Sequence, residues 1–243
     1  MVRAREATRT AQAWIEPMAD DPEAMSALAV ARGRLRAGGA LQGLRRLRVF
    51  ELRGALPDRA AITTLLHRSI QFYNPAKERC TVRLDPREAS PLARGEIGLL
   101  VLERGGERRP GAERWWRHET GGRAEIREGV AWVLRFGAGA KAEEAARDLA
   151  TLRDRDHGLL CNPHWQESRL APGAIPLPWI TGGSTGEDAA PRVATARARS
   201  GRNAAPGAQG ARRASKGKPA RAARAGASRA QRPGRVRRRR IEK

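Results

Sequence analysis

The stretch VAWVLRF, residues 130 to 136, decides the fold because it is apolar at nearly every position and suits a β-strand. Side chains of a strand alternate between two faces, so Trp132, Leu134 and Phe136 share one face and the smaller residues between them share the other. Helices that lie on one side of a sheet cover one face only. A second apolar face left in water would be unfavourable, so the pattern of this strand predicts that a further segment or subunit covers that face.

Two covers are compatible with the sequence. One is the segment that carries Trp115 and Trp116, the only aromatic pair interleaved with bases. The other is a second subunit, which would make the protein a homo-oligomer. We favour the subunit interface and expect it to be formed by Trp132, Leu134 and Phe136. On the inserted segment, at least one of the two tryptophans is expected to pack rather than to stack on nucleic-acid bases.

Working outward from this strand, periodicity and turn residues predict the other elements. Ile62, Leu66, Ile70 and Tyr73 recur at helical spacing after Asp58, a residue that can cap a helix. A second capping residue, Asp21, precedes a proline and an acid. Strands are expected at 47–52, 79–84, 95–104 and 164–170, and helices at 21–35, 58–73 and 142–152. No internal repeat stands out.

This order predicts an α+β protein, a two-layer sandwich of βαββαβ topology in which a segment of about 85–129 is inserted between the middle strands. The domain would occupy residues 43–171. Residues 1–42 would be a partly helical extension, and residues 172–243 a disordered tail, rich first in proline and glycine and then in arginine.

The end of the predicted domain resembles a known family. Leu159, Leu160, Cys161, Asn162 and Pro163 are followed by Gln166 and Glu167, which is similar to the turn between the last helix and the last strand of PurS, the small subunit of phosphoribosylformylglycinamidine synthase (formylglycinamide ribonucleotide amidotransferase). Residues 49–58, VFELRGALPD, are more weakly similar to the first strand and turn of that family.

The resemblance implies a non-catalytic, oligomeric accessory subunit that helps to hold a glutaminase and a synthetase together in purine biosynthesis. It makes Leu160, Asn162, Pro163 and Glu167 structural residues. PurS proteins are about eighty residues long and have a tight turn where this chain inserts residues 85–129, and the Asp-Pro-Gln-Gly element of the family is absent after Leu56.

Other residues suggest chemistry less directly. His157, Cys161 and His164, with Cys80 as a fourth ligand, could be read as a zinc site, but no paired CxxC or HxxxH element is present. A nucleophilic Cys161 beside His164 would lack a third group to orient the base. We therefore expect no catalytic residue, no metal and no cofactor, and the GGSTG stretch at 182–186 reads as linker.

The charge of +22 is concentrated in the C-terminal tail, where residues 191–243 hold 18 Lys and Arg and the single acid Glu242. Such a segment attracts polyanions because each neutralised phosphate releases counterions. The alternative function is therefore a nucleic-acid-associated protein, although a coding bias toward arginine would give the same composition. The residues expected to bind a polyanion are Arg212, Arg213, Arg235, Arg237, Arg238, Arg239 and Arg240.

The remaining composition predicts a cytoplasmic protein that does not enter a membrane. Two cysteines are too few for a disulfide framework, and no apolar run approaches the ~20 residues that span a bilayer. The N-terminus lacks the apolar segment of a secretion signal.

Overall fold

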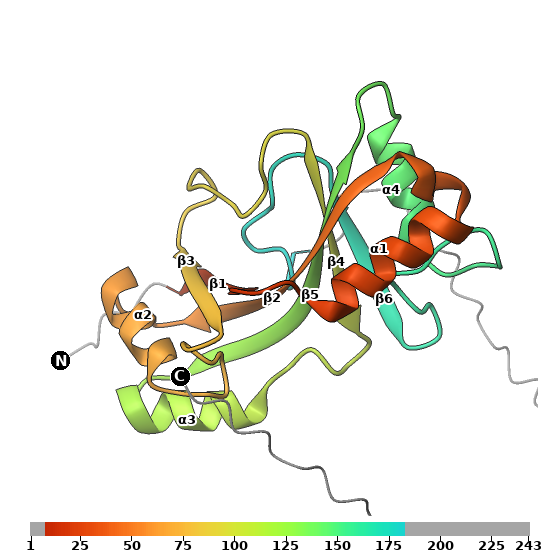
Figure 1. Ribbon diagram of the computed structural model, residues 1–243. Coiled ribbons are helices and arrows are strands. Elements are labelled where there is room, and N and C mark those ends of the chain that lie inside the picture. Colours follow the sequence, from red (N-terminus) through yellow and green to blue (C-terminus); the bar gives the residue numbers. More distant parts are fainter. Residues whose placement is uncertain (1–7, 183–243) are drawn as a thin grey trace, which may run out of the picture. The chain divides into compact units, whose positions relative to one another are not determined.

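The computed structural model describes residues 8–182, which form an α+β fold built on one six-stranded antiparallel sheet (Figure 1). The strands follow the order β3-β1-β2-β5-β4-β6 across the sheet. None of the helices within residues 8–182 has the length and apolar character needed to cross a bilayer. The elements are β1 Arg9–Pro17, α1 Pro22–Arg34, the short 3-10 helix η1 Arg36–Ala40, β2 Leu41–Gly54, α2 Arg59–His67, β3 Glu78–Arg83, β4 Glu96–Glu103, α3 Pro110–Thr120, β5 Ala124–Phe136, α4 Ala142–Ala150 and β6 Gln166–Ala171.

The chain contains an internal structural repeat, contrary to the expectation from the sequence. Each half runs strand, helix, long strand, helix, short strand: β1–α1–β2–α2–β3 and then β4–α3–β5–α4–β6. The sheet order is symmetric about the β2–β5 pair, with β1 and β4 next and the short strands β3 and β6 outermost. The expected order βαββαβ is therefore not found, and the segment 85–129 is no insertion, because it contains the first strand and the first helix of the second half.

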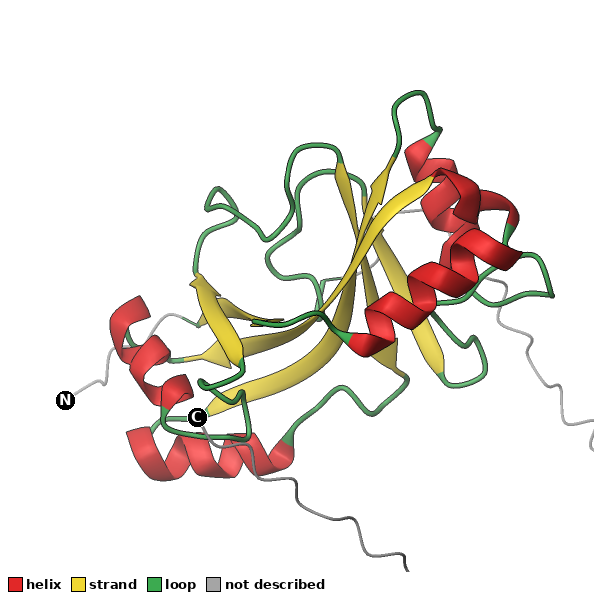
Figure 2. Cartoon of the chain, viewed as in Figure 1, coloured by secondary structure: helices red, strands yellow, loops and turns green. Residues whose placement is uncertain are grey.

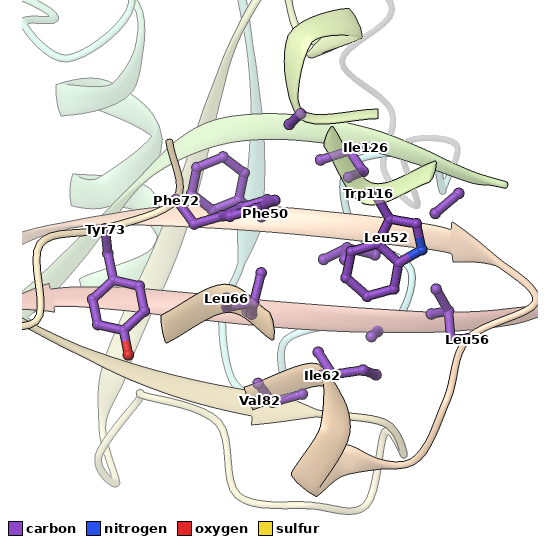
Figure 3. Packing of buried hydrophobic residues seen from close by; sticks show 14 of the residues in the cluster. Phe50, Leu52, Leu56, Ile62, Leu66, Phe72, Tyr73, Val82, Trp116 and Ile126 are labelled. Atoms are coloured by element: carbon purple, nitrogen blue, oxygen red, sulfur yellow. The ribbon is translucent and has the colours of Figure 1, made fainter. Parts of the chain in front are cut away.

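The helices cover one face of the sheet in two pairs, and each pair combines the two halves (Figure 2). Helices α2 and α3 share one apolar cluster with β1, β2 and β3, and α1 and α4 share another with β4 and β5. Figure 3 shows the first cluster, in which Phe50, Leu66 and Trp116 lie together. The prediction that at least one tryptophan of the 115–116 pair packs is confirmed, since Trp116 is fully buried there.

Residues 172–182 cover the opposite face of the sheet. Ile175, Trp179 and Ile180 pack on Ala131 and Val133 of β5 and on neighbouring apolar residues of the sheet. The expectation that disorder begins at residue 172 is therefore wrong for this segment, and the rest of the expected tail lies outside the described residues.

A buried carboxylate holds that covering segment in place. Glu51 of β2 accepts backbone hydrogen bonds from Trp179 at 2.6 Å, from Ile180 at 3.2 Å and from Thr181 at 2.8 Å. Gln12 donates to the Pro176 carbonyl oxygen at 2.8 Å. Buried polar groups need such partners, which explains why charged residues can lie beneath an apolar cover.

The three residues expected at a subunit interface are buried inside the chain. Trp132, Leu134 and Phe136 face the helix layer and pack with α1 and α4. A second subunit is not needed to cover β5, because the helices cover one of its faces and residues 172–182 cover the other. A Leu134→Glu substitution would consequently test folding rather than assembly.

Two boundaries differ from the expectation for physical reasons. Residues 9–17 form the strand β1, within the stretch expected to be a partly helical extension. Both faces of β1 are buried, so its small and polar residues show no simple alternation. Helix α2 ends at His67, so Ile70 lies outside it and is 88% exposed. The helix that Asp21 caps runs to Arg34, as predicted.

Candidate functional site

A groove of about 1240 Å³ lies between α4 and the outermost strand β6, with η1 at its rim. Apolar side chains such as Leu99, Ala145 and Leu170 form much of its lining, while charged residues stand around it. Its lining contains no Phe, Tyr or Trp. This groove is our candidate functional site.

Three small polar side chains meet at the floor of the groove. Thr151 follows α4 directly, forms a parallel bridge with Cys161, and places its Oγ1 3.3 Å from Oγ of Ser168 on β6. Cys161 is only 1% exposed. Burial raises the pKa of the Cys161 thiol, although hydrogen bonds with Ser168 and Thr151 act in the opposite direction. The thiol is consequently protonated at neutral pH.

His157 does not pair with Cys161. Its Nδ1 lies 2.7 Å from Oδ1 of Asp148, and the same oxygen accepts a hydrogen bond from Arg153 at 2.5 Å. His164 is exposed on the turn before β6. Within residues 8–182, no three His, Cys, Asp or Glu side chains converge in a way that could hold a metal ion.

The rim of the groove carries five cations, and three of them have acidic neighbours. Lys141 contacts Glu144, Arg147 contacts Glu143 and Arg153 contacts Asp148. Arg36 and Arg104 are exposed and have no carboxylate partner within the described part of the chain; the guanidinium of Arg104 donates to the Gln166 carbonyl oxygen at 3.1 Å. Two positive charges are therefore available to a ligand that enters the groove.

The Asn162–Pro163 turn leads from α4 into β6, as the sequence predicts. The Asn162 N–H donates to Oε1 of Gln166 at 2.8 Å, and the Gln166 N–H donates back to the Asn162 carbonyl oxygen at 2.8 Å. The other residues of the expected motif differ in role: Leu160 is only half-buried against the helix layer, and Glu167 contacts Arg169 beside the groove.

The same turn occurs in the first half of the chain, before β3. The Asn74 N–H donates to Oε2 of Glu78 at 2.7 Å, and the Glu78 N–H donates to the Asn74 carbonyl oxygen at 2.8 Å. Asn74–Pro75 and Asn162–Pro163 therefore occupy equivalent positions in the two halves of the repeat. The motif on which the family resemblance rests is therefore also a general turn of this fold.

Equivalent positions around the two turns hold side chains of different size. Tyr73 precedes the first turn where Cys161 precedes the second, and Cys80 follows where Ser168 follows. Tyr73 is buried, and its hydroxyl lies 3.0 Å from Nδ1 of His67 at the end of α2. The position that holds the phenol ring of Tyr73 in the first half therefore holds only the small thiol of Cys161 in the second half.

The sequence analysis missed most of the groove. Thr151, Ser168, Arg36 and Arg104 carry no recognised spacing, and they come together only because α4, β6 and η1 pack at one end of the sheet. The one available signal was the recurrence of Asn-Pro followed three residues later by Glu or Gln, which marks the repeat.

Gly158 supports the floor of the groove, and we expect Gly158→Ala to lower the free energy of unfolding by about 2 to 4 kcal/mol. Its φ is +80°, and a Cβ there would lie 1.8 Å from the Thr151 carbonyl oxygen. Gly139 is a matched control, because its φ is +79° but a Cβ would meet nothing within 4 Å. Chemical denaturation of both variants measures the difference, and equal losses would contradict the predicted clash.

Comparison of the chain with protein-family models, curated proteins and solved structures gives no significant match.

Proposed function

We propose that this protein is a non-catalytic binding subunit that holds a partner in the groove between α4 and β6. The observation that carries the proposal is a large groove, partly apolar, whose rim offers two arginines that have no acidic partner among residues 8–182, Arg36 and Arg104. Burial of an apolar surface supplies affinity, and unpaired charges at a rim supply orientation and selectivity.

The environment of Cys161 also favours binding over catalysis. A nucleophilic thiol needs a base within hydrogen-bond reach or a lowered pKa. The side chains that hydrogen-bond Cys161 are the hydroxyls of Thr151 and Ser168, and the pKa of the thiol is raised. The imidazole of His157 is engaged with Asp148 through Nδ1.

The PurS resemblance adds candidate partners to this proposal. If the role of that family extends to this chain, the partners are glutaminase and synthetase subunits of purine biosynthesis. The support is the turn at residues 159–167, and the second copy of that turn at residues 74–78 is explained by the structural repeat alone.

Affinity capture with the full-length protein tests the binding role. We expect Arg36→Glu combined with Arg104→Glu to lose the proteins that the wild type captures from its source cells, because the rim charge is reversed. Arg79→Glu, at an exposed position of the outer strand β3, is the control. Identical sets of captured proteins for wild type and double variant would overturn the proposal, and the presence or absence of purine enzymes decides the candidate partners.

The basic tail supports a second proposed function, association with nucleic acid. Its support is the charge of residues 191–243, where 18 Lys and Arg accompany one acid. The residues expected to bind the polyanion lie outside the described residues, so this proposal rests on composition.

A further inference from the structure

We propose that the groove takes an extended, acidic segment of a partner protein as an additional strand beside β6. This inference rests on the proposed function and specifies the chemistry of the partner. Strand addition of this kind obtains affinity from main-chain hydrogen bonds and selectivity from the side-chain pockets next to them. A groove between a helix and the outermost strand of a sheet provides both.

The outer edge of β6 has backbone groups free to pair. The Arg104 N–H donates to the Trp165 carbonyl oxygen at 2.8 Å, so Trp165 directs its backbone groups toward β4. In an antiparallel strand, the backbone N–H and C=O groups of successive residues point alternately toward a given neighbouring strand and away from it. Counted from Trp165, those of Ser168 and Leu170 therefore point away from β4. Neither residue has a backbone hydrogen bond on that side within residues 8–182, and both line the groove.

The size and lining of the groove favour a peptide over a small molecule or a nucleic acid. Its volume of about 1240 Å³ exceeds the ~300 to 1000 Å³ that is usual for small-molecule sites. Single-stranded nucleic acids bind largely by stacking on aromatic side chains, and the groove lining contains no Phe, Tyr or Trp. Its apolar residues, among them Leu99 and Leu170, suit alternate side chains of an added strand.

The charge of the rim selects an acidic occupant. Arg36 and Arg104 have no carboxylate partner within the described chain, whereas Lys141, Arg147 and Arg153 around the same groove each contact a carboxylate. Residues 191–243 of the protein itself hold the single acid Glu242, so they do not supply the acidic segment that this rim selects.

The two halves of the repeat differ in the size of the side chain beside the turn that precedes the outermost strand. In the first half, the Tyr73 ring is buried beside His67, with their ring centroids 6.1 Å apart. Cys161 and Thr151 are the small side chains at the corresponding junction of helix and turn in the second half. The proposal therefore assigns a single peptide site to each chain.

The test uses full-length protein and a fluorescein-labelled decapeptide of alternating valine and glutamate as the probe. Fluorescence anisotropy should show binding at a stoichiometry of one, which weakens as salt rises. Ser168→Pro removes the outward N–H without touching the ladder with β4, and proline is tolerated at such an edge position. We expect a loss of affinity of about tenfold or more for this variant.

Ser168→Ala is the matched control, since it removes the hydroxyl that approaches Thr151 and keeps the N–H. We expect it to bind the probe more tightly than Ser168→Pro does, and a peptide of alternating valine and lysine to bind the wild type at least about tenfold more weakly than the acidic peptide. Hydrogen exchange on the wild type gives a measurement that needs no substitution: the amides of Ser168 and Leu170 should become protected when the acidic peptide binds.

Each of three results would overturn strand addition. They are unchanged hydrogen exchange at Ser168 and Leu170, equal affinity of Ser168→Pro and Ser168→Ala for the acidic probe, and failure of the acidic probe to bind. These results differ from those that would end the proposed function. A protein that captures partners through Arg36 and Arg104 but leaves the β6 amides unprotected is still a binding subunit, and only the mode of binding proposed here is then wrong.

Discussion

Replacing Trp116 by alanine is expected to lower the free energy of unfolding by about 3 to 5 kcal/mol. Trp116 lies on α3, has 0% of its surface exposed and packs with Leu52 and Ile126 between the sheet and the helix pair α2 and α3 (Figure 3). Loss of the indole removes a large buried apolar surface and leaves a cavity, because the strands beneath it are held by their hydrogen-bonded ladders.

Trp165 provides the matched control because it is the same residue type at a position that is 59% exposed. We expect Trp165→Ala to change stability by less than about 1 kcal/mol, as substitutions at exposed positions generally do. Urea denaturation followed by circular dichroism measures both variants. Similar midpoints for the two would show that α3 does not pack on the sheet.

Binding of the full-length protein to duplex DNA is expected to weaken by about 10³ to 10⁵ between 50 and 200 mM salt, if the tail contacts six to ten phosphates. The 18 Lys and Arg of residues 191–243 exceed that number of contacts. Each contact releases condensed counterions, so the logarithm of the binding constant should fall linearly with the logarithm of the salt concentration.

Truncation after Ala190 supplies the control for this measurement. All of the described helices and strands lie before residue 183, so the truncated chain should unfold at the same urea concentration as the full-length protein. Its affinity for DNA should be lost. DNA binding that survives truncation would place the polyanion site on the folded unit instead, and a salt slope near zero would exclude phosphate contacts as its source.

Local signals in the sequence determined those elements whose stability depends on neighbouring residues. Asp21 and Asp58 were recognised as helix caps, and their side chains accept backbone hydrogen bonds from Glu23 and Ala61, each at 2.9 Å. The apolar runs before Glu103 and Phe136 were recognised as strands, and both are strands. A capping side chain or a run of apolar residues acts over a few positions, so it can be read directly.

Tertiary packing alone decided the remaining features. Gln12 lies on β1 in a position that sequence patterns assign to solvent, yet it is buried because Arg83 and Glu51, distant in the chain, hydrogen-bond its side chain. The helix α3 was not predicted from the sequence, since only one side of it contacts the sheet and most of its other residues are polar.

The groove belongs to this second class. Its floor and rim require Arg36, Arg104, Thr151 and Ser168 to meet, and these residues come from both halves of the repeat. The sequence by itself therefore determined the α+β class, most of the helices and strands, and a strongly basic tail. Only the tertiary structure decided the sheet order, the cover of the second face and the groove, because these depend on contacts between residues far apart in the chain, which leave no local pattern.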